Sequence, residues 1–176
     1  LTLHNYWNVG ASTSYNRAVQ DDRLARGGPS VGRIPLWSVN TYVSTDRRKT
    51  IAADFNAGHS RNRVGARSWS GGGSLVFQPS SSLTVSVGAE AFQGHTVAQY
   101  VRSVSDATAA ATFGGRYVFA DIDRVEVGLP TRVNWIFTPR MSLQLFMQPL
   151  LSVGDYWGFK ELTQPRVFEF TRYGTD

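Results

Sequence analysis

Apolar and polar residues alternate along seven segments of this chain, and the clearest of them runs from Val125 to Phe137. Its odd positions are apolar or Thr, whereas its even positions and the residue before it include Arg124, Glu126 and Arg132. A period of two is typical of a β-strand with two different faces. Such a strand is roughly twice the usual globular length and reaches the about 9–11 residues needed to cross a bilayer. The pattern therefore predicts a transmembrane strand.

The same alternation predicts six further strands, and the whole chain then forms an all-β protein. We expect the seven strands at residues 3–15, 36–45, 51–57, 69–77, 83–91, 125–137 and 141–153. Residues 92–123 extend the fifth and sixth strands around a loop rich in Ala, Thr and Gly, and a tail over residues 154–176 ends without a strand. The predicted fold is an antiparallel up-and-down transmembrane β-barrel, of which residues 1–176 form an incomplete piece within one domain.

The predicted connections alternate between long and short. Short turns follow the second, fourth and sixth strands, and long loops follow the first, third, fifth and seventh. The sequences Phe77-Gln-Pro-Ser-Ser-Ser-Leu83 and Phe137-Thr-Pro-Arg-Met-Ser-Leu143 repeat one turn pattern, in which Pro ends the strand. Short turns of outer-membrane barrels are periplasmic. Seven strands break the even-number rule of these barrels, so we expect at least one further strand. Because Leu1 begins no signal peptide, we expect an exported protein to have lost its start.

Charged residues are confined to one side of the predicted strands, and this favours a membrane barrel over a soluble sandwich. An Arg or Lys that faced lipid at the midplane would cost about 2–4 kcal/mol. The other side is rich in Ser, Gly, Asn and Thr, unlike a solvent-exposed sheet protected by Lys. The residues predicted to face lipid are Trp7, Val39, Phe55, Val85, Val133 and Leu145. The charged residues predicted to face the lumen are Asp54, Glu90, Arg124, Glu126 and Arg132.

The lumen charges leave two interpretations open. Arg124, Glu126 and Arg132 share one strand and could pair with Asp54 or Glu90 on neighbouring strands. They could form a structural ion-pair network that braces the wall. They could also form a charged constriction that selects solutes.

Composition excludes several function classes. The 176 residues include no Cys and carry a formal net charge of +5, so disulfides and thiolate metal sites are absent. Basic loops could bind nucleic acid or anionic lipid head groups, but ordinary solvated charge explains them, and we predict no nucleic-acid partner. His4, His59 and His95 show no metal-ligand spacing. Gly27-Gly28-Pro29 and the Gly71–Gly73 run match no phosphate or dinucleotide motif. We therefore predict no enzyme, metal or cofactor.

Several stretches resemble one family of bacterial outer-membrane proteins, known as domain of unknown function 5916. The stretches are Leu24-Ala-Arg-Gly-Gly-Pro-Ser-Val-Gly-Arg-Ile-Pro35, Ser44-Thr-Asp-Arg-Arg-Lys49, Arg116-Tyr-Val-Phe-Ala-Asp-Ile-Asp123, Phe137-Thr-Pro-Arg-Met-Ser-Leu-Gln-Leu145 and Phe159-Lys-Glu-Leu162. Members often carry an N-terminal carbohydrate-binding module of the family-nine type. The resemblance implies an outer-membrane location and hints at glycan-related work; it supplies no catalytic residues.

Three functions remain open from the sequence. The first is a channel or transport barrel that passes or binds a solute such as an oligosaccharide. The second is a structural barrel that displays a binding module or docks into a larger surface assembly, and the third, more distant, is a barrel-embedded hydrolase. The expected partners are outer-membrane lipid, lipopolysaccharide or oligosaccharide, and other envelope proteins.

Overall fold

The computed structural model describes residues 1–174, almost all of them in β-strands or the turns that join strands. The last two residues of the predicted domain and tail, 175 and 176, lie outside the described part. The strands are β1 (Asn8–Asn16), β2 (Gln20–Asp21), β3 (Val31–Gly32), β4 (Leu36–Ser44), β5 (Ile51–Asn62), β6 (Arg67–Ser80), β7 (Leu83–Ser105), β8 (Gly115–Gly128), β9 (Thr131–Thr138), β10 (Met141–Met147), β11 (Leu150–Leu162) and β12 (Phe170–Arg172); a 3-10 turn, η1 (Ala110–Thr112), precedes β8.

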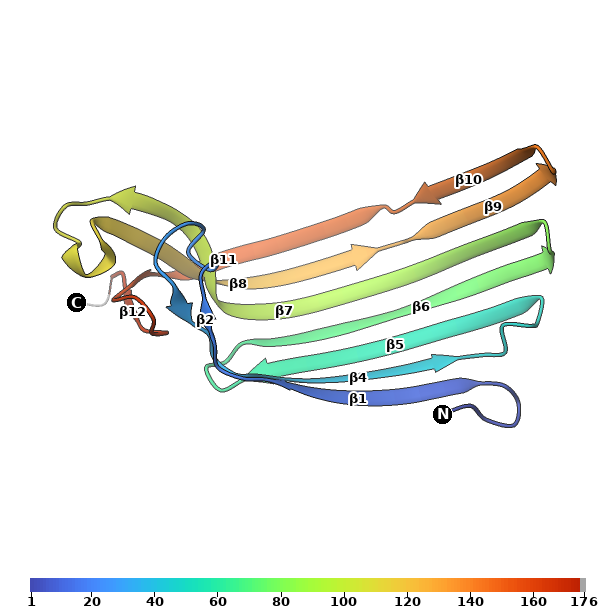
Figure 1. Ribbon diagram of the computed structural model, residues 1–176, viewed down its shortest axis with the longest axis horizontal. Helices are drawn as coiled ribbons and strands as arrows, with labels where there is room; N and C mark the ends of the chain where they lie inside the picture. Colours follow the sequence, from blue (N-terminus) through green and yellow to red (C-terminus); the bar gives the residue numbers. More distant parts are fainter. Residues whose placement is uncertain (175–176) are drawn as a thin grey trace.

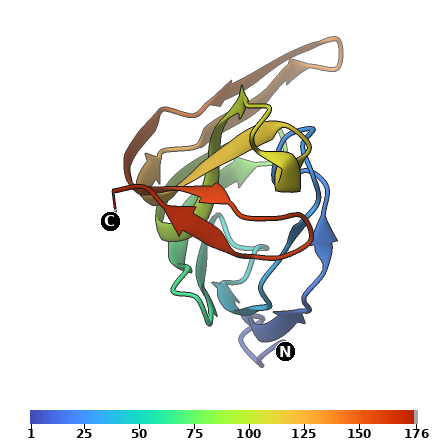
Figure 2. The ribbon, with the colours of Figure 1, turned by 90° about the vertical axis from the view of Figure 1, so that its left-hand side faces the viewer.

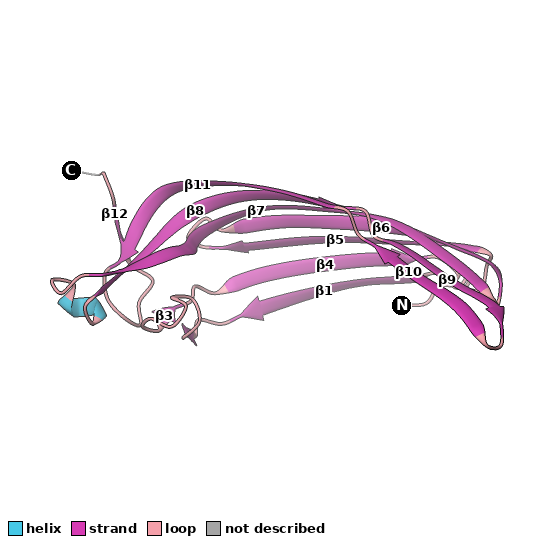
Figure 3. Ribbon diagram, turned by 90° about the horizontal axis from the view of Figure 1, so that it is seen from above, coloured by secondary structure: helices cyan, strands magenta, loops and turns pink. Residues whose placement is uncertain are grey.

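Ten of these strands form one antiparallel sheet, which confirms the predicted all-β class and strand direction. The order is β1-β4-β5-β6-β7-β8-β11-β12, with β9 beside β7 and β10 beside β9, while β2 and β3 form a separate hairpin. Figures 1 and 3 show the long strands running side by side and bending together. Within residues 1–174 the first and last long strands are not paired with each other, so the sheet is open.

Two prolines divide what are otherwise two continuous long strands. The pairing register carries on from β8 to β9 across Leu129 and Pro130, and from β10 to β11 across Gln148 and Pro149. Proline has no N–H to donate, but its carbonyl still accepts: Gly88 N–H donates to Pro130 O at 2.8 Å, and Leu129 N–H donates to Pro149 O at 3.0 Å. When β8 and β9 are counted as one strand, and β10 and β11 as another, the sheet has the seven long strands that the sequence predicts.

The first predicted strand begins too early, because residues 3–7 form a turn. Tyr6 N–H donates to Leu3 O at 2.9 Å, and Tyr6 has a positive φ of 61°. The Asn5 side chain accepts from Trp7 N–H at 3.2 Å, the kind of local bond by which Asn competes with a strand. The alternation from Leu3 onward therefore misleads until Asn8, where β1 begins. Trp7 lies just before the sheet.

The long loop predicted after the third strand is wrong. Strands β5 and β6 continue toward each other and are joined by the four residues 63–66. The Asn62 side chain accepts from Val64 N–H at 3.1 Å and from Ala66 N–H at 2.9 Å, and Gly65 supplies the positive φ of 102° that closes the turn. Arg61 and Arg67 are consequently strand residues. The strict alternation of loop lengths therefore fails at this connection.

The other connections follow the prediction more closely. Short turns join β4 to β5, β6 to β7 and β9 to β10 at one end of the sheet, and the long segments lie at the opposite end (Figure 1). Strands β7 and β8 extend well past their neighbours and turn through residues 106–114, as predicted. The tail departs from the prediction, because β11 continues to Leu162 and residues 170–172 add β12 beside it.

Neither glycine run forms a phosphate motif, as the sequence analysis predicts: Gly27 and Gly28 lie in a turn, and the Gly71–Gly73 run lies in the tightly packed strand β6. Gly27 has a φ of 92°, and a Cβ on Gly28 would lie 2.1 Å from the Tyr117 ring. Gly73 lies inside β6, where a Cβ would lie 2.9 Å from the ring of Phe55. Both runs therefore let aromatic rings approach the backbone.

The long segments assemble into a cap with its own small core. The cap comprises residues 17–35, the tip between β7 and β8, and residues 163–174, which lie in front of the strand ends in Figure 2. Backbone bonds join its parts: Arg166 N–H donates to Ser30 O at 2.7 Å, and Gly32 N–H donates to Val167 O at 3.3 Å. The buried core residues are Ala25, Val31, Ala98, Phe119 and Leu162.

A buried ion pair lies beside this core. Lys160 Nζ is 2.5 Å from Asp121 Oδ1, and the two side chains are only 3% and 2% exposed. The guanidinium of Arg172 lies 3.4 Å from the other Asp121 oxygen.

In the part of the chain that the structure describes, no helix is long and apolar enough to cross a membrane.

The Asp121–Lys160 pair should stabilise the packing of the cap. Asp121→Asn leaves a buried ammonium without its carboxylate, and breaking a buried pair in this way costs about 3–5 kcal/mol. We expect faster hydrogen exchange at Phe119 and Leu162. Asp22→Asn, which changes an exposed carboxylate of the same cap, is the control and should leave exchange unchanged. Slow exchange in both variants would contradict a stabilising role for the pair.

Candidate functional site: the polar face of the sheet

Cross-strand pairing places the predicted lipid-facing strand residues on one face of the sheet. In an antiparallel pair, directly opposed residues point to the same side. Val85 of β7 opposes Val133 of β9, and Val133 opposes Leu145 of β10. Phe55 of β5 opposes Val43, which has the same parity as Val39 on β4. We call this side the apolar face.

The five predicted lumen charges lie together on the opposite face. Asp54 opposes Ser44 and Ser74 across the β4–β5–β6 ladders. Glu90 opposes Gly128, and Glu126 opposes Phe92. Arg124 shares the parity of Glu126 on β8, and Arg132 opposes Ser86 and Phe146. We call this side the polar face.

The apolar face is uncovered in the described chain. Phe55 is 55% exposed, Leu145 50% and Leu151 67%. The surrounding positions are Val, Leu, Ala, Thr or Gly, so the exposed side chains form one band across seven strands. Soluble monomers rarely expose contiguous apolar patches larger than a few hundred Å². A surface of this kind needs an apolar environment to cover it.

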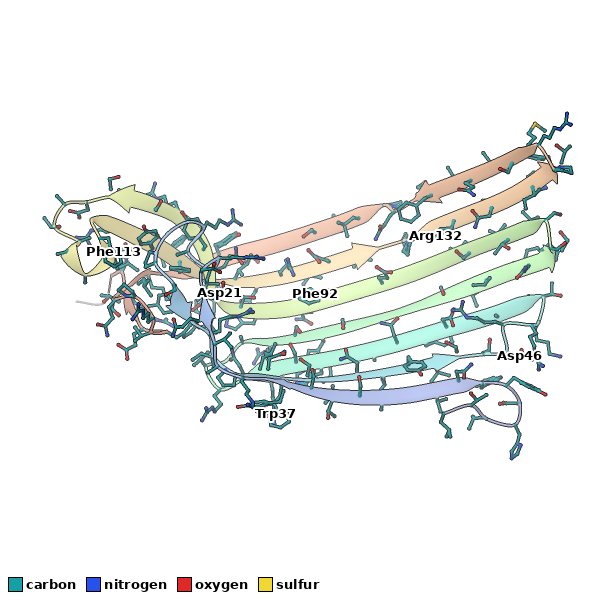
Figure 4. The ribbon with its side chains drawn as sticks, in the orientation of Figure 1. Asp21, Trp37, Asp46, Phe92, Phe113 and Arg132 are labelled. Carbon is teal, nitrogen blue, oxygen red and sulfur yellow. The ribbon has the colours of Figure 1, made fainter. Side chains whose placement is uncertain are left out.

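Aromatic rings border this band on both sides. Toward the cap lie Tyr15 and Trp37, with ring centroids 4.6 Å apart, and the stacked pair His59 and Trp69 at 4.0 Å. Trp37 marks this level in Figure 4. Toward the turns, Trp135 and Phe137 lie 4.4 Å apart. On β6, Trp69 and Phe77 are eight positions apart, or about 26 Å along the strand. We call these two rows the aromatic belts.

Charged residues are present on the apolar face, but only at the cap-side edge of the belt, starting at the level of Trp37. The sequence analysis found none there, because the predicted strands ended too early. The longer strands bring Arg61, Arg67, Asp123 and Asp155 onto this face, each at a position past His59, Trp69 or Val125 toward the cap. The band between the belts carries no Asp, Glu, Lys or Arg within the described strands.

The polar face has a hollow at its centre. A cavity of about 220 Å³ is lined on one side by Asn56 and Ser70 and on the other by Glu90, Phe92 and Glu126. Ser152 Oγ donates to Glu126 at 3.2 Å. The two carboxylates come from β7 and β8, so they share this hollow although they are far apart in sequence. The position is suited to binding hydroxyl groups or cations.

The ion pairs of the polar face differ in part from the predicted network. Arg124 Nε lies 3.5 Å from Glu126 on its own strand, and its guanidinium lies 4.8 Å from the centre of the Phe92 ring. Arg132 lies 4.6 Å from the Phe146 ring centre. Asp54 pairs with Arg47 of the β4–β5 turn at 2.7 Å, not with Arg124 or Arg132. The sequence analysis did not predict this partner, because odd and even positions indicate a face only within a strand and Arg47 lies in a turn.

Aromatic residues on the polar face also escaped the sequence analysis. Tyr42, Phe92 and Phe146 interrupt the Ser, Gly and Asn pattern at even positions. The ring of Tyr42 lies over Gly10, where a Cβ would be 2.3 Å from it. Figure 4 shows Phe92 and Arg132 at separate places along the wall. Gly10 opposes Tyr42 and Ser70 opposes Phe92, whereas Arg132 opposes Phe146, and only the register reveals these partners.

The cap lies over the end of the polar face. A cavity of about 280 Å³ is bounded by Leu24 and Phe168 of the cap and by Ser60, Ser68 and Gly94 of the wall. These three wall residues share the polar side of β5, β6 and β7. The cap therefore narrows the polar face at the end opposite the short turns.

An ion network fixes the tip of the cap, whose place is marked by Phe113 in Figure 4. Arg116 lies 2.5 Å from Asp106 and 2.9 Å from Glu161, which also accepts from the Tyr173 hydroxyl at 2.9 Å. The Thr108 hydroxyl and the Arg116 guanidinium lower the pKa of Asp106 from 3.8 to about 2. Asp106 and Glu161 raise the pKa of Arg116.

No metal-binding cluster accompanies these groups within the described residues. Among residues 1–174, no three His, Asp or Glu side chains gather closely enough to hold a metal ion. His59 Nδ1 lies 2.9 Å from Ser68 O, and His95 Nδ1 lies 2.8 Å from Asp123. His59 and His95 have different partners although they line one hollow, and His4 lies in the turn before β1.

The chain was compared with known proteins at the levels of family, sequence and structure. No family model, curated protein or solved structure matches it. The resemblance to the outer-membrane family therefore remains a prediction from short stretches of sequence.

Acid should loosen the tip of the cap. Because the folded pKa of Asp106 is lowered, its contribution to stability is complete above 3.8 and is lost as the pH falls toward about 2. The chain has no Cys, so Ala107→Cys provides a unique position for a spin label. We expect the label to become mobile over this pH window. Asp106→Asn should give a mobile label at both ends of the window; a pH-dependent transition in that variant would assign the effect to another group.

Proposed function

We propose that this chain forms part of the wall of an outer-membrane β-barrel whose polar lumen passes or binds a polar solute. The apolar face would contact lipid, and the polar face would line the lumen. Further strands, from the same protein or from a second copy, would pair with the free edges of the sheet. No enzymatic activity is part of the proposal, since the polar face carries no nucleophile–base arrangement that the described contacts assemble.

One observation carries the membrane part of the proposal. A charge-free, uncovered apolar band crosses seven antiparallel strands and is bordered on both sides by aromatic belts. Transmembrane barrels have such a band, roughly 25 Å tall, with aromatic girdles at both interfaces. A soluble sandwich would need a second sheet to cover this band, and the described chain provides none. The cap stays at one end and leaves the band open.

The solute part rests on the chemistry of the polar face. Its centre combines the Glu90 and Glu126 carboxylates with the Asn56 amide and the Phe92 ring. Carboxylates and amides bind hydroxyl groups, and the half-buried Phe92 ring offers part of its apolar surface to a sugar. An oligosaccharide is therefore a fitting class of solute, in agreement with the family resemblance. The cap over the polar face would limit which solutes enter.

Substitutions at adjacent positions test the lipid-facing assignment. Val133→Arg would place a charge in the band and should cost about 2–4 kcal/mol. Asn134→Arg places the same charge on the polar face and should be tolerated. Folding of both variants into lipid vesicles, with comparison of their urea midpoints, measures the difference. Equal losses in the two variants would show that the faces are wrongly assigned.

A charge reversal tests the lumen. Arg132 lies exposed on the polar face near Phe146, so Arg132→Glu should shift the selectivity of the channel toward cations. Conductance in planar bilayers, with different salt concentrations on the two sides, gives the reversal potential. Arg140→Glu, in the short turn between β9 and β10, makes the same charge change at the end of the wall and should shift it less. Conductance absent from correctly inserted protein would refute solute passage.

A further inference from the structure

A row of mostly polar side chains crosses the apolar face at the cap-side edge of the aromatic belt, at the level of Trp37. Its members are successive cross-strand partners: Trp37 opposes Arg61, Arg61 opposes Arg67, Arg67 opposes His95, His95 opposes Asp123, and Asp123 opposes Asp155. We call this set the interfacial row. It runs over β4, β5, β6, β7, β8 and β11 and lies on the outside of the proposed barrel.

Two arginines lie directly opposite each other in this row. Like charges at opposed positions of an antiparallel pair repel and destabilise the sheet. Among residues 1–174 no acidic side chain lies within 4.0 Å of the guanidinium of Arg61 or Arg67 in an ion pair. The exposed fractions of both residues are high. Within the described residues the pair therefore has no direct ion-pair partner, and the Asp123 carboxylate acts on Arg67 only over a longer distance.

The acidic end of the row is occupied by other partners. Asp123 lies 2.8 Å from His95 Nδ1 and accepts from Trp157 Nε1 at 2.8 Å. His95 also stacks on Trp157, with centroids 5.6 Å apart. These contacts hold Asp123 on the β7, β8 and β11 side. The row thus has a positive end at Arg61 and Arg67 and a negative end at Asp123 and Asp155.

A broad hollow covers this part of the face. It measures about 760 Å³. Arg61, Arg67, His59 and Trp69 line it on the β5–β6 part of the row, and His95, Asp123 and Asp155 line its acidic end. On one side it borders the stacked His59–Trp69 pair, which belongs to the aromatic belt. The hollow therefore opens where the apolar band ends and charge begins.

We propose that Arg61 and Arg67 bind the phosphate of a phosphorylated glycolipid in the outer leaflet of the membrane. Guanidinium groups match phosphate geometry with parallel charge-assisted hydrogen bonds, and a bound phosphate removes the repulsion between the opposed arginines. A lipid is the source because the site borders the band that faces acyl chains, at the level where a headgroup lies. This inference rests on the membrane location proposed above.

The test uses the protein in phosphatidylcholine vesicles that contain either a glycolipid bearing phosphate, such as lipid A, or the same glycolipid with its phosphates removed. Protection from external protease first establishes insertion. The thermal unfolding midpoint is then measured as the fraction of each glycolipid rises. We expect the phosphorylated form to raise the midpoint of the unmodified protein and the dephosphorylated form to leave it nearly unchanged.

Single substitutions locate the effect. Arg61→Gln and Arg67→Gln should each need at least about ten times more phosphorylated glycolipid for the same shift, since each variant loses a hydrogen bond to a charged group. Arg63→Gln removes an equal charge from the adjacent turn and should behave like the unmodified protein. If all three variants respond alike, the effect is general surface charge and the site is refuted.

The remaining outcomes separate this inference from the proposed function. Normal insertion with equal midpoints in both glycolipids would overturn the phosphate site alone. Failure to insert would overturn the membrane location, and the phosphate site with it. An equal stabilisation by inorganic phosphate, in vesicles free of phosphorylated lipid, would overturn the assignment of a lipid as the ligand.

Discussion

The backbone ladder of the seven long strands is the constraint on which the rest of the structure depends. It pairs the N–H and C=O groups of one strand with those of the next, and its pleat sends neighbouring side chains to opposite faces. A shift of one residue between two strands would bring Arg132 into line with the valines of the apolar face. The register from Val39 to Leu145 keeps all five lumen charges on one side. Even Pro130 and Pro149 interrupt bonds without shifting it.

Sequence alone could predict the faces because alternation is a local property. Val85, Val133 and Leu145 needed only their parity, and the pairing then brought them together. Boundaries were harder, since they depend on competing local bonds: Asn5 closes a turn inside an alternating run, and Asn62 with Gly65 closes one where charged residues resembled a loop. The same error hid the arginine pair, because Arg61 and Arg67 were taken for loop charges. Contacts such as Arg47 with Asp54 depend on turn geometry that parity does not describe.

The cap follows from the length of the strands. Strand β7 spans 23 residues, about twice the 9–11 that a bilayer accommodates. Its outer part extends beyond the region where lipid would cover one face, so the apolar side chains there must pack against other parts of the protein. The buried stretch Val118–Asp121 on β8 shows this change, because four consecutive residues are buried where both faces are covered. Loops after β1 and β11 supply the covering side chains, and one core forms from segments distant in sequence.

The chemistry changes with position along one strand, and this links the separate parts of the proposal. On β8, Val125 and Val127 face the apolar side in the band, Asp123 follows at the level of the belt with His95 and Trp157, and Asp121 lies buried with Lys160 in the cap. These residues share one parity, so their different surroundings come from depth alone. Lipid, headgroup and protein core would then succeed one another along a single face. The opposed arginines lie at the middle level, where the proposed phosphate would supply a counter-charge.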